Sequence, residues 1–199
     1  MREYDEIAAW FTATRSPDVG LADLADLART LPPRARVLDL GCGDGVPVSR
    51  LFYERGLPLA ALDSSSAMLA RYRVHFPGVP VRCVRAQDAR FAPASFEAVV
   101  AWGVLFHLSE ADQAAVVENV SEWLTPGGRF LFTSGGVRGV SEGEMNGVAF
   151  RYVSLGADDY RRLLERSGMR LDDHHVDAWD NDVYVATKAA RVPDPDRTA

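Results

Sequence analysis

Residues 37–45 read Val-Leu-Asp-Leu-Gly-Cys-Gly-Asp-Gly. A short apolar run that contains an acid passes directly into three glycines that alternate with small polar residues, and Val46 opens a helical pattern. The order predicts a strand, a glycine loop and the start of a helix. Because glycine reaches positive φ and has no Cβ, a ligand can approach the backbone of such a loop closely.

The spacing of the glycines narrows the kind of ligand. The loop is G-x-G-x-G rather than G-x-G-x-x-G, and it lacks the Lys-Ser/Thr pair of a phosphate-binding P-loop. A pyrophosphate is therefore not the favoured ligand. Taken alone, a loop of this kind is also compatible with a structural turn or a dinucleotide site, so the segments that follow it decide between these interpretations.

The next two apolar runs lead to carboxylates. Asp63 directly follows the run at residues 58–62, and Asp88 and Ala89 come shortly after the run at residues 79–84. An acid that closes the strand beside the glycine loop can bind two ribose hydroxyls, and a carboxylate after the third strand can accept a hydrogen bond from an adenine amino group. Each acid has a simpler interpretation, a helix cap for Asp63 and a solvated loop acid for Asp88. Their places at the ends of consecutive strands favour ligand binding.

The rest of the chain alternates helical and strand patterns without repeats or an internal linker. Two more strands are predicted at residues 98–102 and 128–133, and the second follows the turn Thr125-Pro126-Gly127-Gly128. Helices are predicted at residues 3–13, 20–30, 46–55, 65–76, 110–124 and 157–167. Ser109 is a good N-cap for the fifth of these helices, and Gly168 is a good stop for the sixth.

In this order and at these spacings, the motifs resemble those of class I S-adenosylmethionine-dependent methyltransferases of the small, stand-alone kind. The resemblance runs from about Arg34 to Lys188. It implies an α/β fold with a Rossmann-like, seven-stranded, mostly parallel sheet and helices on both faces. Residues 169–176 and 182–188 would form the C-terminal antiparallel strand pair that distinguishes this sheet from a wholly parallel dinucleotide-binding one.

The resemblance also assigns the cofactor, S-adenosyl-L-methionine, with S-adenosyl-L-homocysteine as its product. The glycine loop would surround the methionine end, Asp63 would bind the ribose, Asp88 would contact the adenine, and the end of the fourth strand would pass the sulfonium. The cofactor-binding residues implied in this way are Asp39, Gly41, Cys42, Gly43, Asp63, Ser64, Met68, Asp88, Ala89, Ala101 and Trp102.

Length and composition fit one domain, and the resemblance implies a methyltransferase domain over residues 1–189. Its expected parts are an N-terminal helical cap (1–33), a cofactor-binding core (34–134) and a substrate lid (135–152), and residues 190–199 are expected to form a disordered tail. The stretch 4–8, Tyr-Asp-Glu-Ile-Ala, resembles the helix that closes over the cofactor in this family. The lid assignment rests on a long, glycine-rich connection after strand five.

Charge and cysteine content exclude several classes of protein. A net charge of −6 and scattered Arg residues disfavour a nucleic-acid substrate, although an RNA or a protein acceptor stays an alternative. The longest apolar stretches fall short of the ~20 residues that span a bilayer, so no membrane partner and a cytoplasmic location are expected. Cys42 and Cys83 do not form a metal or disulfide pattern, and both are expected to be small buried residues.

Substrate choice is expected to depend on residues outside the shared core. Candidates for binding the small-molecule methyl acceptor are aromatic and apolar residues of the first helix, the fourth strand end and the long connection, namely Tyr4, Trp10, Phe106, Met145, Phe150 and Tyr152. Core packing is the simpler interpretation of the aromatic residues in the first helix. The chain is expected to act as a monomer or a homodimer.

His107 is the candidate catalytic base, because it follows the fourth strand and imidazole titrates near neutrality. Bracing of the next helix is its structural alternative. His174 and His175 lie among Asp172, Asp173 and Asp177, but adjacent strand residues point to opposite faces, so no metal site is expected there.

The function expected from the sequence is in-line methyl transfer to an oxygen or nitrogen atom of a small molecule, without a metal. A non-catalytic S-adenosylmethionine-binding regulatory protein is an alternative, because the chemistry needs few catalytic groups. A nicotinamide-dependent dehydrogenase is disfavoured by the glycine spacing and the final strand pair.

Overall fold

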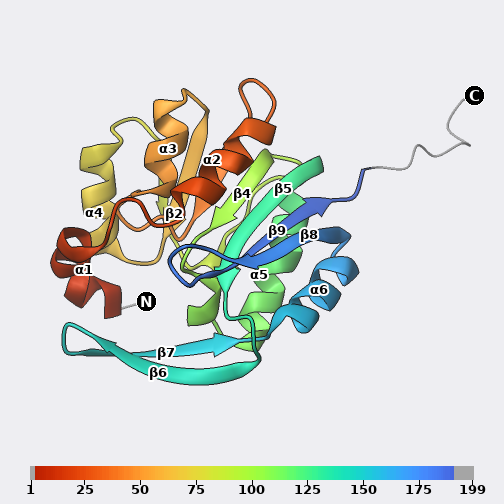
Figure 1. Ribbon diagram of the computed structural model, residues 1–199. Coiled ribbons are helices and arrows are strands. Elements are labelled where there is room, and N and C mark those ends of the chain that lie inside the picture. Colours follow the sequence, from red (N-terminus) through yellow and green to blue (C-terminus); the bar gives the residue numbers. More distant parts are fainter. Residues whose placement is uncertain (1–2, 191–199) are drawn as a thin grey trace, which may run out of the picture.

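A central sheet organises the protein, and its strands follow the order β3-β2-β1-β4-β5-β9-β8 in the computed structural model, which describes residues 3–190 (Figure 1). The strand bounds are β1 (Val37–Leu40), β2 (Leu59–Asp63), β3 (Val81–Cys83), β4 (Phe96–Ala101), β5 (Leu124–Ser134), β8 (Met169–Val176) and β9 (Asp182–Lys188). The first five strands are mutually parallel, and β9 runs antiparallel to both β5 and β8. The predicted seven-stranded sheet with its terminal antiparallel pair is confirmed.

The strand order reverses between β1 and β4, which are direct neighbours in the sheet. At such a switch point the connections from adjacent strands leave toward opposite faces, so a crevice opens at the carboxyl ends of the strands. The glycine loop follows β1 and the segment from Trp102 to His107 follows β4. The sheet therefore brings these two loops, far apart in sequence, to the two sides of one crevice.

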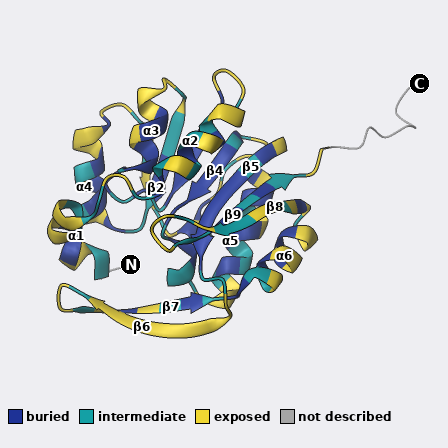
Figure 2. Ribbon diagram, viewed as in Figure 1, coloured by how far each residue is buried: buried dark blue, intermediate teal, exposed yellow. Residues whose placement is uncertain are grey.

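Helices cover both faces of the sheet, as predicted. Their bounds are α1 (Glu3–Thr14), α2 (Leu21–Thr30), α3 (Val48–Glu54), α4 (Ser66–His75), α5 (Glu110–Trp123) and α6 (Ala157–Arg166), with two short 3-10 turns, η1 (Ala86–Asp88) and η2 (Leu105–His107). The cluster containing Leu24 of α2 and Phe52 of α3 also holds Val37 and Val100, whereas Leu38 and Leu40 pack with α5 and α6. Alternate strand residues thus face opposite helical layers, and Figure 2 shows the buried strands between them.

The connection after β5 differs from an irregular lid. It forms an antiparallel hairpin of β6 (Gly139–Met145) and β7 (Val148–Ser154), which lies apart from the main sheet at the bottom of Figure 1. The outer strand β6 is exposed along almost its whole length, whereas Phe150 and Val153 of β7 are buried. The connection at residues 135–152, which the sequence analysis expected to be a loop, therefore consists largely of two paired strands.

One expectation about the core is wrong. Cys42 is buried as expected, but Cys83 is exposed. The reason is position, because β3 is the edge strand of the sheet and all three of its side chains reach solvent to some extent. Within residues 3–190 no helix is long and apolar enough to cross a membrane. The predicted tail beyond Ala190 lies outside the described residues.

Candidate active site

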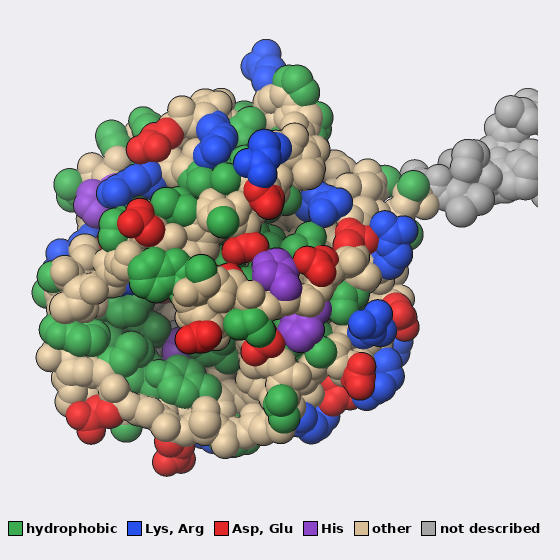
Figure 3. All heavy atoms as spheres, in the orientation of Figure 1, with side chains coloured by type: hydrophobic (Ala, Val, Ile, Leu, Met, Phe, Trp, Pro, Cys, Tyr) green, Lys and Arg blue, Asp and Glu red, His purple; other side chains and the backbone are tan. Residues whose placement is uncertain are grey.

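A cleft of about 1040 Å³ lies over the carboxyl ends of the strands, between the sheet and a cover formed by α1 and the β6–β7 hairpin. Figure 3 shows it as a hollow lined mainly by hydrophobic side chains. We divide it into two parts. The cofactor half comprises the lining residues of the glycine loop, β2, α4, η1 and the following turns. The acceptor half comprises those of α1, η2, the hairpin, the end of β5 and the β8–β9 turn.

The glycine loop lines the cofactor half through Gly41 and Gly43, whose φ angles are +77° and +55°. A Cβ on Gly41 would lie 2.2 Å from Cγ2 of Val104, and one on Gly43 would lie 3.0 Å from Cε of Met68. Side chains at these positions would therefore be strained by both the backbone and the contacts. The loop presents bare backbone to the cleft, which is the cradle that a closely bound ligand requires.

Asp63 at the end of β2 also faces the cleft, and its carboxylate ties the loop to α4. One oxygen accepts a hydrogen bond from the Gly43 N–H at 2.9 Å, and the other accepts from the Ser65 N–H at 2.7 Å. Burial raises the pKa of Asp63, and these two hydrogen bonds oppose the rise. The predicted neighbours Ser64 and Met68 line the same part of the cleft.

Asp39 and Cys42 support the loop from behind and do not line the cleft. Asp39 is 1% exposed, accepts a 2.7 Å hydrogen bond from Ser49 Oγ, and Ser49 in turn bonds to the Tyr72 hydroxyl at 2.9 Å. Burial raises the pKa of Asp39 to about 7, and burial also raises the pKa of the Cys42 thiol. Ala101, predicted beside the sulfonium, is fully buried in the sheet, whereas Trp102 lines the cleft.

The predicted adenine contact lies at the rim. Asp88 is half exposed and forms an ion pair with Arg85 at 2.7 Å, and Ala89 is buried behind it. The residues of this turn that do line the cleft are Arg85, Ala86 and Gln87. Contact between Asp88 and an adenine amino group stays a prediction; Arg85 Nε donates to Oδ2 of this carboxylate, so Oδ1 can accept from the amino group.

His107 and Tyr4 meet across the acceptor half. The Tyr4 hydroxyl lies 3.1 Å from Nε2 of His107. Burial lowers the pKa of His107 to about 4 and raises the pKa of Tyr4 above its ordinary range. Both side chains are therefore neutral at pH 7, and the phenol is the donor when the imidazole presents Nε2 as an acceptor.

An aromatic wall surrounds this pair. The ring centres of Phe150 and Tyr4 are 5.2 Å apart. The ring centre of Tyr152 lies 5.3 Å from that of His107 and 5.6 Å from that of Phe106. Phe106, Met145 and Tyr152 line the cleft, whereas Phe150 lies behind Tyr4 and is 4% exposed. Trp10, another acceptor-site candidate, is 37% exposed on α1 and does not line the cleft.

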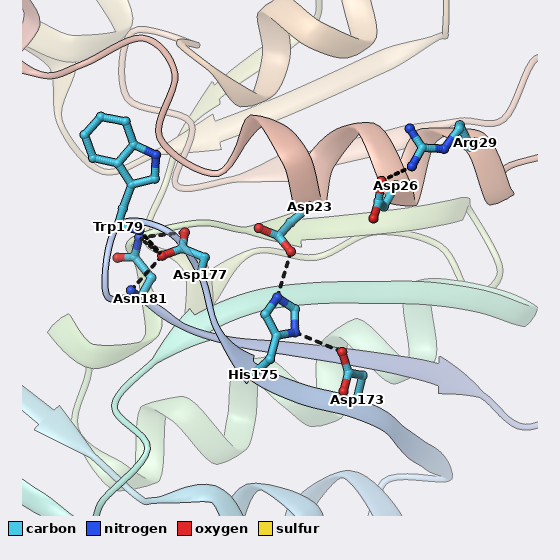
Figure 4. Close-up of polar contacts among 8 residues, drawn as sticks. All are labelled: Asp23, Asp26, Arg29, Asp173, His175, Asp177, Trp179 and Asn181. Carbon is cyan, nitrogen blue, oxygen red and sulfur yellow. Dashed lines mark hydrogen bonds and ion pairs between the residues drawn. The ribbon is translucent and has the colours of Figure 1, made fainter.

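The turn between β8 and β9 adds polar groups that sequence reasoning missed. The Asp177 carboxylate accepts hydrogen bonds from the backbone N–H groups of Trp179 and Asn181, and this fixes the turn that presents Asp180, Asn181 and Asp182 to the cleft (Figure 4). The Asp and Asn residues between the last two strands do predict a turn, but nothing in the sequence indicates that this turn faces the cleft.

The two adjacent histidines of β8 have separate partners. His174 bonds to Asp182 at 2.9 Å. His175 lies between Asp23 of α2 and Asp173, at 2.9 Å from each, as Figure 4 shows. The carboxylates raise the pKa of His175, against the opposing effect of burial. These contacts join α2 to the edge of the sheet.

Arg15 is the second residue that sequence reasoning missed. It follows α1 as a single cation in an aromatic segment, lines the cleft and lies 5.4 Å from the centre of the Phe11 ring. Burial lowers the pKa of its guanidinium, whereas Tyr4, Asp44 and Asp39 act in the opposite direction. Arg15 therefore lines the same cleft as Gly41 and Gly43 and interacts electrostatically with Tyr4, Asp44 and Asp39.

Comparisons with known proteins find methyltransferases among the proteins similar to this chain. A family model described as a methyltransferase domain matches residues 37–128. The chain is 32% identical over 144 residues to a ubiquinone biosynthesis O-methyltransferase of Xylella fastidiosa, an alignment that covers 70% of this chain and 54% of that protein. The chain spans about half the length of the curated relatives it matches.

Two solved structures share the fold. One is CalS10 with bound SAM, an amino pentose methyltransferase from Micromonospora echinaspora, with a TM-score of 0.73 and 21% identity over 92% of this chain and 95% of that one. The other is the CcbJ methyltransferase from Streptomyces caelestis, with a TM-score of 0.76 and 18% identity over 94% of this chain and 98% of that one.

Proposed function

The chain belongs to the class I S-adenosylmethionine-dependent methyltransferases, and we propose that it transfers the methyl group of that cofactor to an oxygen or nitrogen atom of a small molecule. The observation that carries the proposal is the junction of Gly43 and Asp63 in the cleft. The bare backbone of the glycine loop suits the methionine end of the cofactor. The carboxylate at the end of the adjacent strand suits the ribose of the same molecule.

The residues of the cofactor half fit this molecule part by part. A carboxylate has about four acceptor sites. The N–H groups of Gly43 and Ser65 each bond to one oxygen of Asp63, and the Ser64 backbone also interacts with it, so the remaining acceptor capacity is available to the ribose hydroxyls. The Arg15 guanidinium, which lines the same cleft, suits the methionine carboxylate. Residues 85–87 and Val84 offer the apolar and polar edge for adenine. When bound, the cofactor supplies a methyl group on a positively charged sulfur.

The acceptor half contributes shape and exclusion of water. Tyr4, Phe106 and Tyr152 form a wall against which an apolar or aromatic acceptor can pack, while α1 and the hairpin cover the cleft. Holding the acceptor atom in line with the reacting methyl group accounts for much of the rate in such a displacement. The His107 imidazole is neutral at pH 7 and can form one hydrogen bond with the molecule that accepts the methyl group. We propose this hydrogen bond as its catalytic role.

The charges of the acceptor half limit which classes of molecule can accept the methyl group. Its charged lining residues among those described are Glu3, Asp180 and Asp182, all acidic. A neutral or cationic acceptor can enter this half without repulsion, whereas a phosphate or an acidic molecule meets these carboxylates, and the nearby cation Arg15 is the residue we propose for the methionine carboxylate of the cofactor. We therefore propose phenols, alcohols and amines over anionic acceptors.

Three measurements test the proposal. Calorimetry with S-adenosylhomocysteine is expected to show binding that Asp63→Ala weakens, and NAD is expected to leave the melting temperature unchanged. A panel of phenols, alcohols, amines and carboxylic acids is then assayed for release of S-adenosylhomocysteine. Turnover of a small molecule supports the proposal. Binding of the cofactor without turnover of small molecules, RNA or protein would instead indicate a non-catalytic binding protein.

A further inference from the structure

A buried chain of hydrogen bonds connects the hairpin to the acceptor half of the cleft. It runs from the backbone of β7 through Gln113 of α5 and Tyr160 of α6 to Ser134 at the end of β5. Gln113 and Tyr160 are fully buried, whereas Ser134 is 5% exposed and lines the cleft. Because buried polar groups pair with one another and each has a fixed set of donors and acceptors, the direction of every hydrogen bond in the chain follows from its neighbours.

Two carbonyl groups fix the orientation of the Gln113 amide. Its Nε2 lies 3.0 Å from the carbonyl oxygen of Leu108 and 2.8 Å from that of Val153. A carbonyl oxygen only accepts hydrogen bonds, so the NH2 group, which has two donors, must face this pair. The opposite orientation would place the amide oxygen against two acceptors. Oε1 of Gln113 is therefore the atom that faces Tyr160, and it can only accept.

The fixed amide sets the direction of the next two hydrogen bonds. Tyr160 donates its phenol proton to Gln113 Oε1 at 2.5 Å, because an amide oxygen has no proton to give. Burial raises the pKa of Tyr160, so the phenol keeps this proton at neutral pH. The same phenol oxygen lies 2.5 Å from Ser134 Oγ. Since the phenol has one proton and Gln113 receives it, Ser134 is the donor in this second bond.

The hydroxyl of Ser134 is thereby left as an acceptor toward the cleft. Its single proton is directed to Tyr160, which does not line the cleft, and the lone pairs of its oxygen remain. Among the described residues, the structure shows no donor to this oxygen. A bound molecule with an O–H or N–H group can satisfy it, whereas a molecule that carries only acceptors at this point leaves both groups unpaired.

We propose that Ser134 is a specificity-determining residue, which accepts a hydrogen bond from an O–H or N–H group of the bound methyl acceptor. This inference rests on the proposed function. It favours alcohols, phenols and amines with an N–H over ketones and ethers of similar shape. Gln113 and Tyr160 act as positioning residues, because they hold the proton of Ser134 away from the cleft. Selectivity then comes from the polar groups that a wrong molecule leaves unpaired.

The test compares phenol with anisole, in which a methyl group replaces the phenol proton. Both dissociation constants are measured by NMR titration of the whole protein saturated with S-adenosylhomocysteine. Their ratio is compared between variants, because a change in the shape of the site affects the two molecules similarly. In Ser134→Ala the preference for phenol is expected to fall by about fivefold relative to the unmodified chain, since phenol loses a hydrogen bond and anisole does not. Ser134→Thr keeps the hydroxyl and is expected to retain the preference.

A second variant tests the direction of the hydrogen bonds. Tyr160→Phe keeps the ring and removes the phenol, so the Ser134 proton becomes free to donate into the cleft. Anisole is then expected to gain affinity relative to phenol by about threefold, whereas a merely structural Tyr160 would weaken both molecules alike. Ser134→Ala leaves the bond between Tyr160 and Gln113 intact, so the test stands even where Tyr160→Phe does not fold.

The matched control is Ser121→Ala. Ser121 is also a buried serine whose hydroxyl donates to an oxygen, the carbonyl of Ser167, but it does not line the cleft. Its substitution removes a hydrogen bond of the same kind from the interior of the protein. The ratio of the two dissociation constants is therefore expected to equal that of the unmodified chain.

The outcomes are distinguishable. Failure of the unmodified chain to bind S-adenosylhomocysteine would remove the proposed function and this inference with it. Where S-adenosylhomocysteine binds, an unchanged ratio in Ser134→Ala would overturn the role of Ser134 and leave the proposed function standing. Absence of phenol binding to the unmodified protein, or an equal loss of phenol and anisole affinity in Ser134→Ala, would overturn it as well, because neither result contains a hydrogen bond specific to the O–H group.

Discussion

The two halves of the cleft are built in different ways. The cofactor half consists mainly of backbone and of one carboxylate at the ends of adjacent parallel strands, and its parts other than Arg15 lie within residues 41–87. The acceptor half consists of side chains from α1, η2, the hairpin and the β8–β9 turn, which span almost the whole chain. Sheet topology assembles the first except for Arg15, whereas tertiary packing of separate elements assembles the second.

This difference predicts where substitutions act. A change in the cofactor half meets a rigid sheet edge and is expected to affect cofactor binding steeply. A change in the acceptor half meets elements held by few contacts and is expected to affect acceptor turnover while cofactor affinity stays nearly constant. A substitution that changes cofactor affinity and acceptor turnover to the same extent would contradict this difference between the two halves.

The largest effect is expected from Asp63→Ala. The substitution removes the acceptor for two ribose hydroxyls and leaves the Gly43 and Ser65 N–H groups unpaired. Two charge-assisted hydrogen bonds contribute about 1.5–3 kcal/mol each, so the dissociation constant of S-adenosylhomocysteine is expected to rise by about a hundredfold or more. Calorimetry measures it, and Asp158→Ala on the exposed face of α6 is the control. An unchanged constant in a folded variant would remove the ribose assignment.

A second large effect concerns pH and the acid behind the glycine loop. The folded pKa of Asp39, about 7, is above its unfolded value of 3.8, because burial disfavours the charged carboxylate. The native state therefore binds this proton more tightly, so the stabilisation is fully present below about pH 4 and is lost as pH rises to about 7. A shift of this size corresponds to about 4 kcal/mol.

Denaturant unfolding of the unmodified chain and of Asp39→Asn between pH 4 and pH 8 checks this. The amide does not titrate, so the variant is expected to lose the part of the decline that Asp39 causes. Parallel curves for the two proteins would show that Asp39 is charged in the folded state throughout this range, and that the cofactor half tolerates a buried charge.

An intermediate effect is expected from shortening the hairpin. Replacing residues 143–150 by Asn-Gly keeps the pair Glu142 and Arg151 at the end of a shorter hairpin and removes Met145 and Phe150. Loss of these contacts to Tyr4 and the cleft is expected to lower acceptor turnover by about tenfold. The affinity for S-adenosylhomocysteine is expected to stay within about threefold, or ~0.7 kcal/mol. A parallel loss of cofactor affinity would show that the hairpin belongs to both halves.

The same difference explains what could be predicted from the sequence. The strands around the glycine loop and the helices between them were predicted to within a few residues, because each buried strand is a continuous apolar run and α4 and α5 begin at serine caps. The cofactor half follows directly, since parallel strands bring their carboxyl ends to one edge.

The hairpin and Arg15 could not be predicted in this way. In β6 the side chains alternate without an inner face, and Val140, Glu142 and Glu144 all reach solvent, so no period-2 burial pattern exists to read. Its strand conformation comes from pairing with β7, which in turn packs on Tyr4 and His107. Arg15 faces the cleft because α1 folds back over α4, a long-range contact that leaves no local signal.

The smallest effect is expected from Tyr4→Phe. The substitution keeps the ring that packs on Phe150 and removes only the hydroxyl that bonds to His107. One neutral hydrogen bond contributes about 0.5–1.5 kcal/mol, so acceptor turnover is expected to fall by about two- to tenfold while cofactor affinity stays unchanged. Because the pKa of His107 is about 4, the imidazole is neutral throughout pH 6 to 8, and the size of the effect is expected to be constant across that range. An effect that grows or vanishes near pH 6.5 would show that His107 titrates there, and would favour a role as proton acceptor over one as a neutral hydrogen-bonding group.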